Sequence, residues 1–273
     1  MSDKILVTGG TGTLGRHLVP LLRQADREVR VLTRHSRPTA DGVQYVACDL
    51  LTHDDAGLDA ALEGVSTVVH LAGGPKGDDV ATNHLVRAAV RAQVSHLVFV
   101  SVIAAELVPI GYFRRKLASE QIVAESGVPF TILRAAQFHD LALWTARKMA
   151  KLPVLVAPTG VRWQPVDSGE VAARLAELAL DEPAGRVPDL AGPRVYRLDE
   201  LVEGYLRAIG KRRWKLPVYV PGKAGRVYRS GENLSLIGTS VGRRTWEEFL
   251  AEQVGAAAPE PVVQAGPRAA GLS

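Results

Sequence analysis

The sequence has almost no cysteine and no long apolar run, and both absences narrow the class of protein. Its single cysteine, Cys48, excludes an intramolecular disulfide and any metal site built from several cysteines. No apolar run approaches the roughly 20 residues that a membrane helix needs. The first residues also lack the charged segment and following apolar segment of a secretory signal. We therefore expect a cytoplasmic protein with no membrane partner.

Motifs for metal binding and for hydrolysis are absent as well. The 7 histidines show no H-x-x-x-H or H-E-x-x-H spacing, and there is no G-x-S-x-G nucleophile elbow. We therefore predict no metal and no hydrolase of that type. The formal net charge is +4, and the one basic stretch, residues 211–215, is too short to predict a nucleic-acid surface. The positive excess is either ordinary surface charge or, in part, the counterpart of a phosphorylated ligand.

The periodicity of the apolar residues predicts an α/β fold. Short β-branched runs, such as KILVT at residues 4–8, alternate with helical patterns of about 10–15 residues. This alternation is typical of βαβ units, which build a parallel sheet covered by helices on both faces. We predict a Rossmann-type doubly wound parallel sheet with strands at residues 4–8, 28–33, 43–47, 65–71, 96–101 and 129–133, and helices at residues 13–22, 53–62, 78–92, 112–126, 138–150, 168–180, 198–209 and 245–254.

A glycine-rich turn links the first predicted strand to the first predicted helix. Gly10, Gly12 and Gly15 fit G-x-G-x-x-G, and Gly9 offers a second, overlapping pattern. Between a strand and a helix, this pattern is typical of a dinucleotide site. Glycine permits the tight turn, the close approach of a pyrophosphate and the packing of helix on strand, while the helix N-terminus attracts the phosphates. We predict that this site is formed by Gly9, Thr11, Gly12, Thr13, Leu14 and Gly15.

The end of the second strand bears on the choice between NAD and NADP. An acidic residue there selects the free 2′-hydroxyl of NAD, whereas a nearby arginine accommodates the 2′-phosphate of NADP. This chain has no acid in that position, and Arg34 is available for a charge-assisted bond to a phosphate. We therefore predict NADPH in preference to NADH; the alternative is that Arg34 is an exposed loop residue.

The residue pattern changes after residue 152, where regular alternation of strands and helices gives way to shorter pieces. Pro153, Pro158 and Pro165 interrupt short extended pieces, and the last residues are rich in alanine, proline and glycine. We predict an NAD(P)-binding domain at residues 1–152, a smaller substrate-side lobe packed on the sheet at residues 153–254, and a flexible tail at residues 255–273.

These residues resemble the short-chain dehydrogenase/reductase superfamily. More narrowly, they are similar to its atypical NmrA-like, NAD(P)H-binding branch, which includes isoflavone-reductase-like enzymes. The resemblance covers residues 3–210 and rests on Thr8–Gly15, Asp49-Leu50, His70–Gly73, Ser101, Tyr112–Lys116, Val128–Arg134 and Pro165–Asp167.

The resemblance implies a role for each matching position. Asp49 and Leu50 would flank the adenine, and Lys116 would hold the hydroxyls of the nicotinamide ribose. The path to that ribose would be lined by Leu71, Ala72 and Gly73. Near the nicotinamide or the substrate would lie Gln137 and Phe138.

Three residues are candidates for catalysis. Tyr112 and Lys116 lie four positions apart, so they share one face of a helix. In Y-x-x-x-K chemistry the ammonium lowers the pKa of the tyrosine hydroxyl, which exchanges a proton with a carbonyl or alcohol oxygen. Ser101, at the end of a strand, is a candidate to hydrogen-bond that oxygen. Only ten residues separate Ser101 from Tyr112, fewer than in the best-known enzymes of the superfamily, so the alternative is that Ser101 does not reach the substrate. In isoflavone-reductase-like relatives the lysine alone is the main proton-handling group.

Three functions are compatible with this pattern. The first is an NADP(H)-dependent oxidoreductase that acts on a small organic carbonyl, enone, quinone or imine, as a monomer or homodimer. The second is a non-catalytic dinucleotide sensor, and the third is an epimerase or isomerase with bound cofactor. The pair Tyr112 and Lys116 favours an enzyme over a sensor, and the small C-terminal lobe argues against a nucleotide-sugar substrate.

Overall fold

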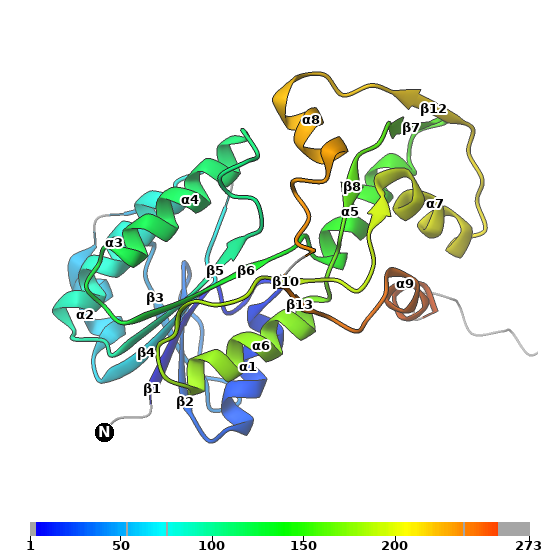
Figure 1. Ribbon diagram of the computed structural model, residues 1–273. Coiled ribbons are helices and arrows are strands. Elements are labelled where there is room, and N and C mark those ends of the chain that lie inside the picture. Colours follow the sequence, from blue (N-terminus) through cyan, green and yellow to red (C-terminus); the bar gives the residue numbers. More distant parts are fainter. Residues whose placement is uncertain (1–3, 53, 75, 237, 256–273) are drawn as a thin grey trace, which may run out of the picture.

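A parallel sheet forms the centre of the molecule. The computed structural model describes residues 4–52, 54–74, 76–236 and 238–255 (Figure 1). Within these ranges the main sheet has the strand order β13-β10-β6-β5-β4-β1-β2-β3, with β9 beside β6, and its pairings are parallel. The strands are β1 (Lys4–Thr8), β2 (Glu28–Thr33), β3 (Gln44–Ala47), β4 (Val65–His70), β5 (His96–Val102), β6 (Phe130–Ala135), β9 (Gly185–Arg186), β10 (Leu190–Ala191) and β13 (Ser240–Val241).

The strand order alone indicates where a ligand site should lie. From β3 to β6 it reads 3-2-1-4-5-6, which is the order of the dinucleotide-binding α/β folds. The chain leaves β1 towards β2 and β3 and returns to β4 on the opposite side of β1. In such sheets ligands bind beyond the carboxyl ends of the strands, where this reversal opens a crevice. The predicted Rossmann-type fold is therefore confirmed.

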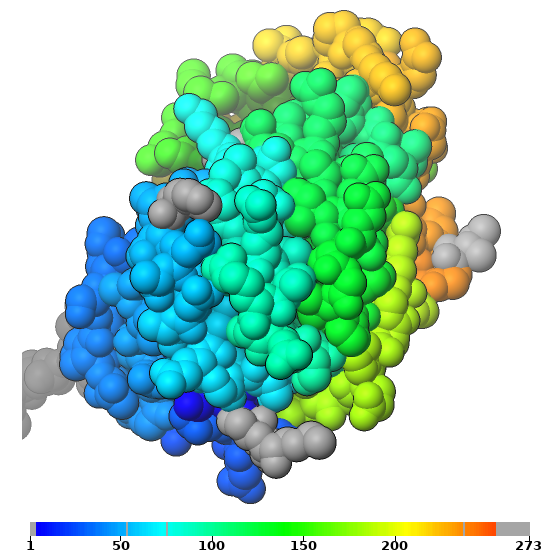
Figure 2. Space-filling model, turned by 90° about the vertical axis from the view of Figure 1, so that its left-hand side faces the viewer, coloured from blue at the N-terminus to red at the C-terminus, as the bar shows by residue number. Residues whose placement is uncertain are grey.

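Helices cover both faces of the sheet (Figure 1). On one face lie α1 (Gly15–Gln24) and α6 (Ser168–Leu180), and on the other lie α2 (Asp55–Leu62), α3 (Asp78–Arg91) and α4 (Gly111–Ala124). Figure 2 shows α3 and α4 side by side across the second face. Each layer encloses its own apolar core, and all of β5 is buried between them. No described helix is long and apolar enough to cross a membrane.

A second region stands beside the carboxyl edge of the sheet. It contains the pairs β7–β12 and β8–β11, together with four helices (Figure 1). The packing of α5 on α7 and of α7 on α9 gives this region its own apolar clusters. Its elements are α5 (His139–Met149), β7 (Leu155–Pro158), β8 (Arg162–Trp163), β11 (Tyr196–Arg197), α7 (Leu198–Ala208), β12 (Lys215–Val218), α8 (Gly222–Ser230) and α9 (Trp246–Gly255).

The predicted strands and helices are present, with ends that differ by no more than two residues where both are described. The predicted boundary at residue 152 does not separate sheet from lobe, because α5 precedes it and belongs to the lobe, whereas α6, β9, β10 and β13 follow it and complete the sheet layer. The chain crosses between the two regions several times. His53 and the predicted tail beyond Gly255 lie outside the described residues.

Candidate functional site

A cavity of about 760 Å³ lies at the carboxyl edge of the sheet, where the strand order reverses. Its walls come from the glycine turn after β1, the ends of β2 and β5, the loops after β3 and β4, and the first turns of α3 and α4. The volume falls within the range of about 300–1,000 Å³ that small-molecule and cofactor sites occupy. Of the residues predicted from sequence, the cavity is lined by Gly9, Thr11, Gly12, Thr13, Leu14, Arg34, Asp49, Leu50, Leu71, Ala72, Gly73, Ser101, Tyr112, Lys116 and Phe138.

The glycines of the turn are required by close backbone contacts. Gly9 has φ +68°, and a Cβ there would lie 2.8 Å from the amide nitrogen of Ala72. A Cβ on Gly10 would lie 2.7 Å from Val31, and one on Gly15 would collide with the backbone of Gly10. Gly15 therefore lies beneath the cavity rather than in its wall, where it allows α1 to pack closely against the turn.

The N-terminus of α1 is open towards the cavity. The residue before the helix, Leu14, makes no side-chain cap, and the first turn contains no acidic residue. Thr13 and Leu14 line the cavity, so the positive end of the helix dipole faces it. This arrangement suits a diphosphate.

Arg34 is exposed at the rim of this cavity, directly after β2. Its guanidinium forms no ion pair with another described residue. Thr33, beside it, donates its hydroxyl hydrogen bond to the carbonyl of His35 at 2.6 Å and holds the turn. Asp49 and Leu50 line the same cavity from the loop after β3. Arg34, Asp49 and Leu50 therefore line one and the same cavity.

Lys116 and Asp78 form a buried ion pair in the cavity wall. The two charged atoms, Lys116 Nζ and Asp78 Oδ2, lie 3.1 Å apart, and both side chains are at most 5% exposed. The ammonium also donates to the carbonyl of Val100 at 3.3 Å and lies 4.8 Å from the centre of the Phe99 ring. From the sequence, Asp78 is expected only at the start of a helix. Its position just after a glycine-rich loop at a strand end was the signal that it belongs to the site.

Tyr112 differs from its sequence-based description. Burial, together with the negative charge of Asp78, raises the pKa of Tyr112 to about 12. The prediction that a lysine ammonium lowers this pKa is therefore wrong, because burial and the charge of Asp78, which also pairs with Lys116, raise it. Tyr112 keeps its proton at neutral pH and lines the cavity, so its hydroxyl is a proton donor rather than a ready base.

Ser101, the next-to-last residue of β5, lies in the wall of the same cavity. Its hydroxyl oxygen is buried and has no hydrogen-bond partner among the described residues. A buried polar group without a partner is rare and costly in a folded protein. Ser101 therefore fits a site in which a bound molecule provides the missing partner.

Buried polar groups linked by hydrogen bonds lie behind the cavity wall and hold it in place. His70 is fully buried between the hydroxyls of Thr8, at 2.7 Å, and Thr82, at 3.1 Å. Burial lowers the pKa of His70 to about 3, with a further contribution from Lys116, so the ring is neutral. Thr8 also accepts a hydrogen bond from the amide of Ala72, which fixes the loop after β4 against the glycine turn. His70 is therefore a core histidine whose two ring nitrogens both have hydrogen-bond partners.

One predicted position of this region, Gln137, lies apart from the cavity. Gln137 is not in the cavity wall; its carbonyl accepts a hydrogen bond from the amide of Val166. Its predicted place near the nicotinamide is therefore not supported, whereas its neighbour Phe138 does line the cavity. Within the described residues, no group of three potential ligands is arranged to hold a metal ion.

Known proteins resemble this chain in sequence over most of its length. A family model described as NAD(P)H-binding matches residues 9–182. A (4-alkanoyl-5-oxo-2,5-dihydrofuran-3-yl)methyl phosphate reductase of Streptomyces griseus is 34% identical over 76% of this chain and 74% of its own length. An NAD(P)H azoreductase of Xenophilus azovorans is 30% identical, again over 76% of this chain and 74% of its own length.

Solved structures share the fold. An NADPH-dependent quinone oxidoreductase of Escherichia coli, in complex with NADPH, superposes with a TM-score of 0.77 at 20% identity, over 91% of this chain and 99% of its own. A nucleoside-diphosphate-sugar epimerase of Staphylococcus aureus superposes with a TM-score of 0.73 at 19% identity, over 92% of this chain and 99% of its own.

Proposed function

The chain belongs to the NAD(P)H-binding family, and from this we propose that it is an NADPH-dependent oxidoreductase of small organic carbonyls, enones, quinones or imines. One observation carries the proposal. Ser101, Tyr112 and Lys116 reach the same cavity as the glycine turn, so groups able to handle a proton lie where a dinucleotide would end. The names of the relatives, a phosphate-ester reductase and an azoreductase, support reductive chemistry.

The residues in the cavity fit a nicotinamide dinucleotide. The open N-terminus of α1 would hold the diphosphate, Arg34 the 2′-phosphate, and Lys116 the ribose hydroxyls. When bound, the cofactor supplies or accepts the hydride. The unpartnered hydroxyl of Ser101 would donate a hydrogen bond to the substrate oxygen or nitrogen. Tyr112, which is protonated at neutral pH, would provide the proton that accompanies the hydride in the reducing direction.

Asp78 would keep Lys116 in place during this chemistry. The ion pair is buried, so the ammonium has one preferred position against the cavity wall. Removing Asp78 would leave an unpaired buried cation, which is strongly disfavoured. We therefore assign Asp78 a positioning role, acting through Lys116.

The preference for NADPH rests on Arg34 and is tested by cofactor titration. Arg34→Ala should weaken NADPH binding about tenfold or more, because a charge-assisted bond is lost, and leave NADH binding nearly unchanged. Arg37→Ala is the matched control, since Arg37 is exposed three residues further on and does not line the cavity. Tighter binding of NADH than of NADPH by the unaltered protein would contradict the proposal.

The catalytic assignment is tested by NADPH consumption with a panel of quinones, enones and imines. Tyr112→Phe should lower kcat by about 10²–10⁴ if the hydroxyl is the proton donor. Lys116→Met should mainly weaken cofactor binding. Tyr205→Phe, a half-buried tyrosine in α7, is the control and should leave both parameters unchanged. Equal turnover in the Tyr112 and Tyr205 variants would remove the tyrosine from the mechanism.

A sensor is the second candidate, and one observation favours it. Asp78 neutralises Lys116 and the pKa of Tyr112 is raised, so this pair does not provide a catalytic base. A sensor would bind NADPH tightly and consume none with any member of the panel. An epimerase would instead convert a nucleotide sugar with no net change in cofactor.

A further inference from the structure

Two chain segments form one surface at the end of the lobe away from the main sheet (Figure 1). They are residues 144–154, at the end of α5 and beyond it, and residues 207–219, which run from the end of α7 through β12. β7, which directly follows the first segment, pairs in parallel with β12 of the second. The amide of Leu155 donates to the carbonyl of Trp214 at 2.8 Å, and Arg213 donates to the carbonyl of Leu152 at 3.3 Å. We call residues 144–154 and 207–219 the basic lobe surface.

This surface exposes large apolar side chains to solvent. Trp214 is 87% exposed, and Trp144, on the neighbouring segment, is 59% exposed. Residues 211–219 are exposed without interruption. Scattered apolar residues are normal on a protein surface, but a contiguous group marks an interaction site. The further exposed apolar residues of the surface are Leu152, Val154, Leu216, Val218 and Tyr219.

The charged residues of the same surface are all positive. Its two segments contain eight lysines and arginines and no acidic residue, although the net charge of the whole chain is only +4. Of these, Lys215 is paired with Asp199 and Glu203 of α7. Lys148 lies over the ring of Trp144, 5.6 Å from its centre. The remaining cations form no ion pair with another residue of the described chain, and they are Arg147, Lys151, Arg207, Lys211, Arg212 and Arg213.

We infer that the basic lobe surface binds the face of an anionic lipid bilayer. Tryptophan, tyrosine and leucine insert at the boundary between headgroups and acyl chains, and lysine and arginine attract the anionic headgroups. Clusters of about 4–8 basic residues beside such apolar groups are typical of proteins that bind acidic phospholipid. This mode requires no spanning helix. It differs from the expectation of no membrane partner, which rests only on the absence of a membrane-spanning segment and a secretory signal.

The composition of the surface favours this partner over three others. A symmetric dimer through the same surface would place its positive charges against each other. Addition of a strand to the edge of β12 is opposed by Pro217, which has no amide hydrogen to donate. Single-stranded nucleic acid would use the two tryptophans for base stacking, but the aliphatic residues Leu152, Val154 and Leu216 offer it nothing.

The inference is tested by sedimentation of the full chain with vesicles of phosphatidylcholine and phosphatidylglycerol, beside vesicles of phosphatidylcholine alone. We expect binding to the mixed vesicles that weakens with salt. Arg212→Glu should weaken this binding about tenfold, because it replaces attraction to the headgroups by repulsion. Trp214→Ala should weaken it by a similar factor, and both side chains are exposed, so neither change should disturb folding.

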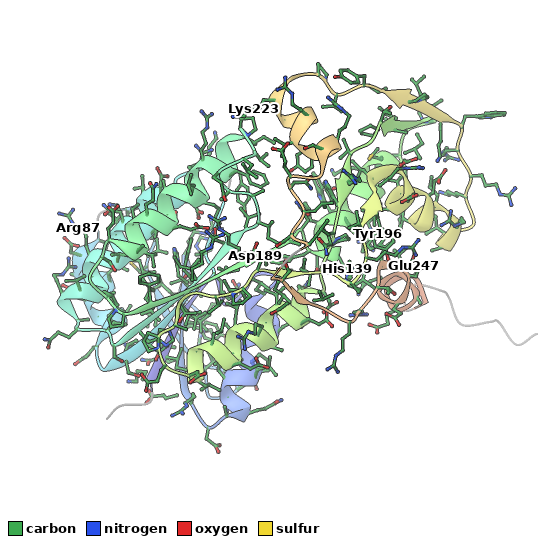
Figure 3. All side chains as sticks on the ribbon, viewed as in Figure 1. Arg87, His139, Asp189, Tyr196, Lys223 and Glu247 are labelled. Carbon is green, nitrogen blue, oxygen red and sulfur yellow. The ribbon has the colours of Figure 1, made fainter. Side chains whose placement is uncertain are left out.

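The matched control is Arg87→Glu, which makes the same charge change on α3, far from the lobe (Figure 3). It should leave vesicle binding unchanged. No binding to mixed vesicles, equal binding to neutral vesicles, equal loss in the Arg87 and Arg212 variants, or tighter binding to a single-stranded oligonucleotide would each overturn the inference. NADPH turnover in solution should be the same in all three variants, so failure here is distinguishable from failure of the proposed function.

Discussion

At the scale of single residues, the site is defined by which charges neutralise each other. The spacing of Tyr112 and Lys116 predicts that they share a helix face, and both indeed line the cavity. Asp78 comes from a different helix, α3, and takes up the charge of Lys116. Burial, together with the charge of Asp78, therefore moves the pKa of Tyr112 in the direction opposite to that expected from the Y-x-x-x-K motif alone.

This arrangement predicts the pH dependence of turnover. Because the pKa of Tyr112 is raised from 10.0 to about 12, its hydroxyl remains protonated through pH 10. If it donates the proton, kcat should stay level up to pH 10 and fall only as the pH approaches 12. Asp78→Asn removes the carboxylate that contributes to the shift, so the decline should move to lower pH. A pH profile of kcat with saturating NADPH checks both statements; a decline near neutral pH in the unaltered protein would contradict them.

At the scale of elements, a buried arginine joins β6 to α4 and to the loop after β5. Arg134 is buried at the end of β6 beside Ser101, its partner in register on β5. Two of its nitrogens donate to Glu120 of α4 at 2.7 and 2.6 Å, and a third donates to Glu106 at 2.8 Å. The loop that carries Glu106 also contains Ala104 in the left-handed region, with φ +62°. Arg134 therefore holds a strained loop between Ser101 and Tyr112.

The two carboxylates around Arg134 should contribute unequally to stability. Glu120 is buried, so Glu120→Gln should lower the free energy of unfolding by about 3 kcal/mol. The Glu106 side chain is 46% exposed, and Glu106→Gln should cost about 1 kcal/mol or less, because solvent screens the pair. Urea unfolding of both variants measures the difference. Equal losses would mean that burial does not decide the strength of these pairs.

The elements themselves were largely predictable, because their signals are local. Apolar runs such as residues 4–8 and helical periodicity specify each strand and helix without reference to the rest of the chain. The short strands β7 to β13, mostly of two residues, carry no comparable pattern. They exist because neighbouring backbone edges pair with them, which only the assembled sheet and lobe provide.

At the scale of the whole molecule, Asp167 joins the sheet layer to the lobe. It caps α6 by accepting hydrogen bonds from the amides of Gly169 and Glu170, and it pairs with Arg244, just before α9, at 2.9 Å. His139, at the start of α5, lies 3.9 Å away. Figure 3 shows His139 near the contact between β11 and α9 within the lobe, where the Tyr196 hydroxyl donates to Glu247 at 2.6 Å.

This junction predicts a loss of stability in acid. Burial alone would raise the pKa of Asp167, but His139, the two amides and Arg244 together outweigh it and lower the pKa from 3.8 to about 2. A lowered pKa contributes stability above pH 3.8 that is lost as the pH falls through about 2. Asp167→Asn should therefore lower the free energy of unfolding at neutral pH by about 2 kcal/mol and flatten its dependence between these pH values. Urea titrations at several pH values provide the check, and an unchanged acid dependence would count against it.

Sequence alone determined the parallel α/β layout, the glycine turn and the candidates Ser101, Tyr112 and Lys116, because turn geometry and helical spacing act over a few residues. Tertiary structure alone decided that Asp78 neutralises Lys116, that Gln137 lies outside the cavity, and that residues 144–154 meet residues 207–219 in one basic surface. These outcomes depend on contacts between residues far apart in the chain. Burial and charge pairing are set only when such segments pack together.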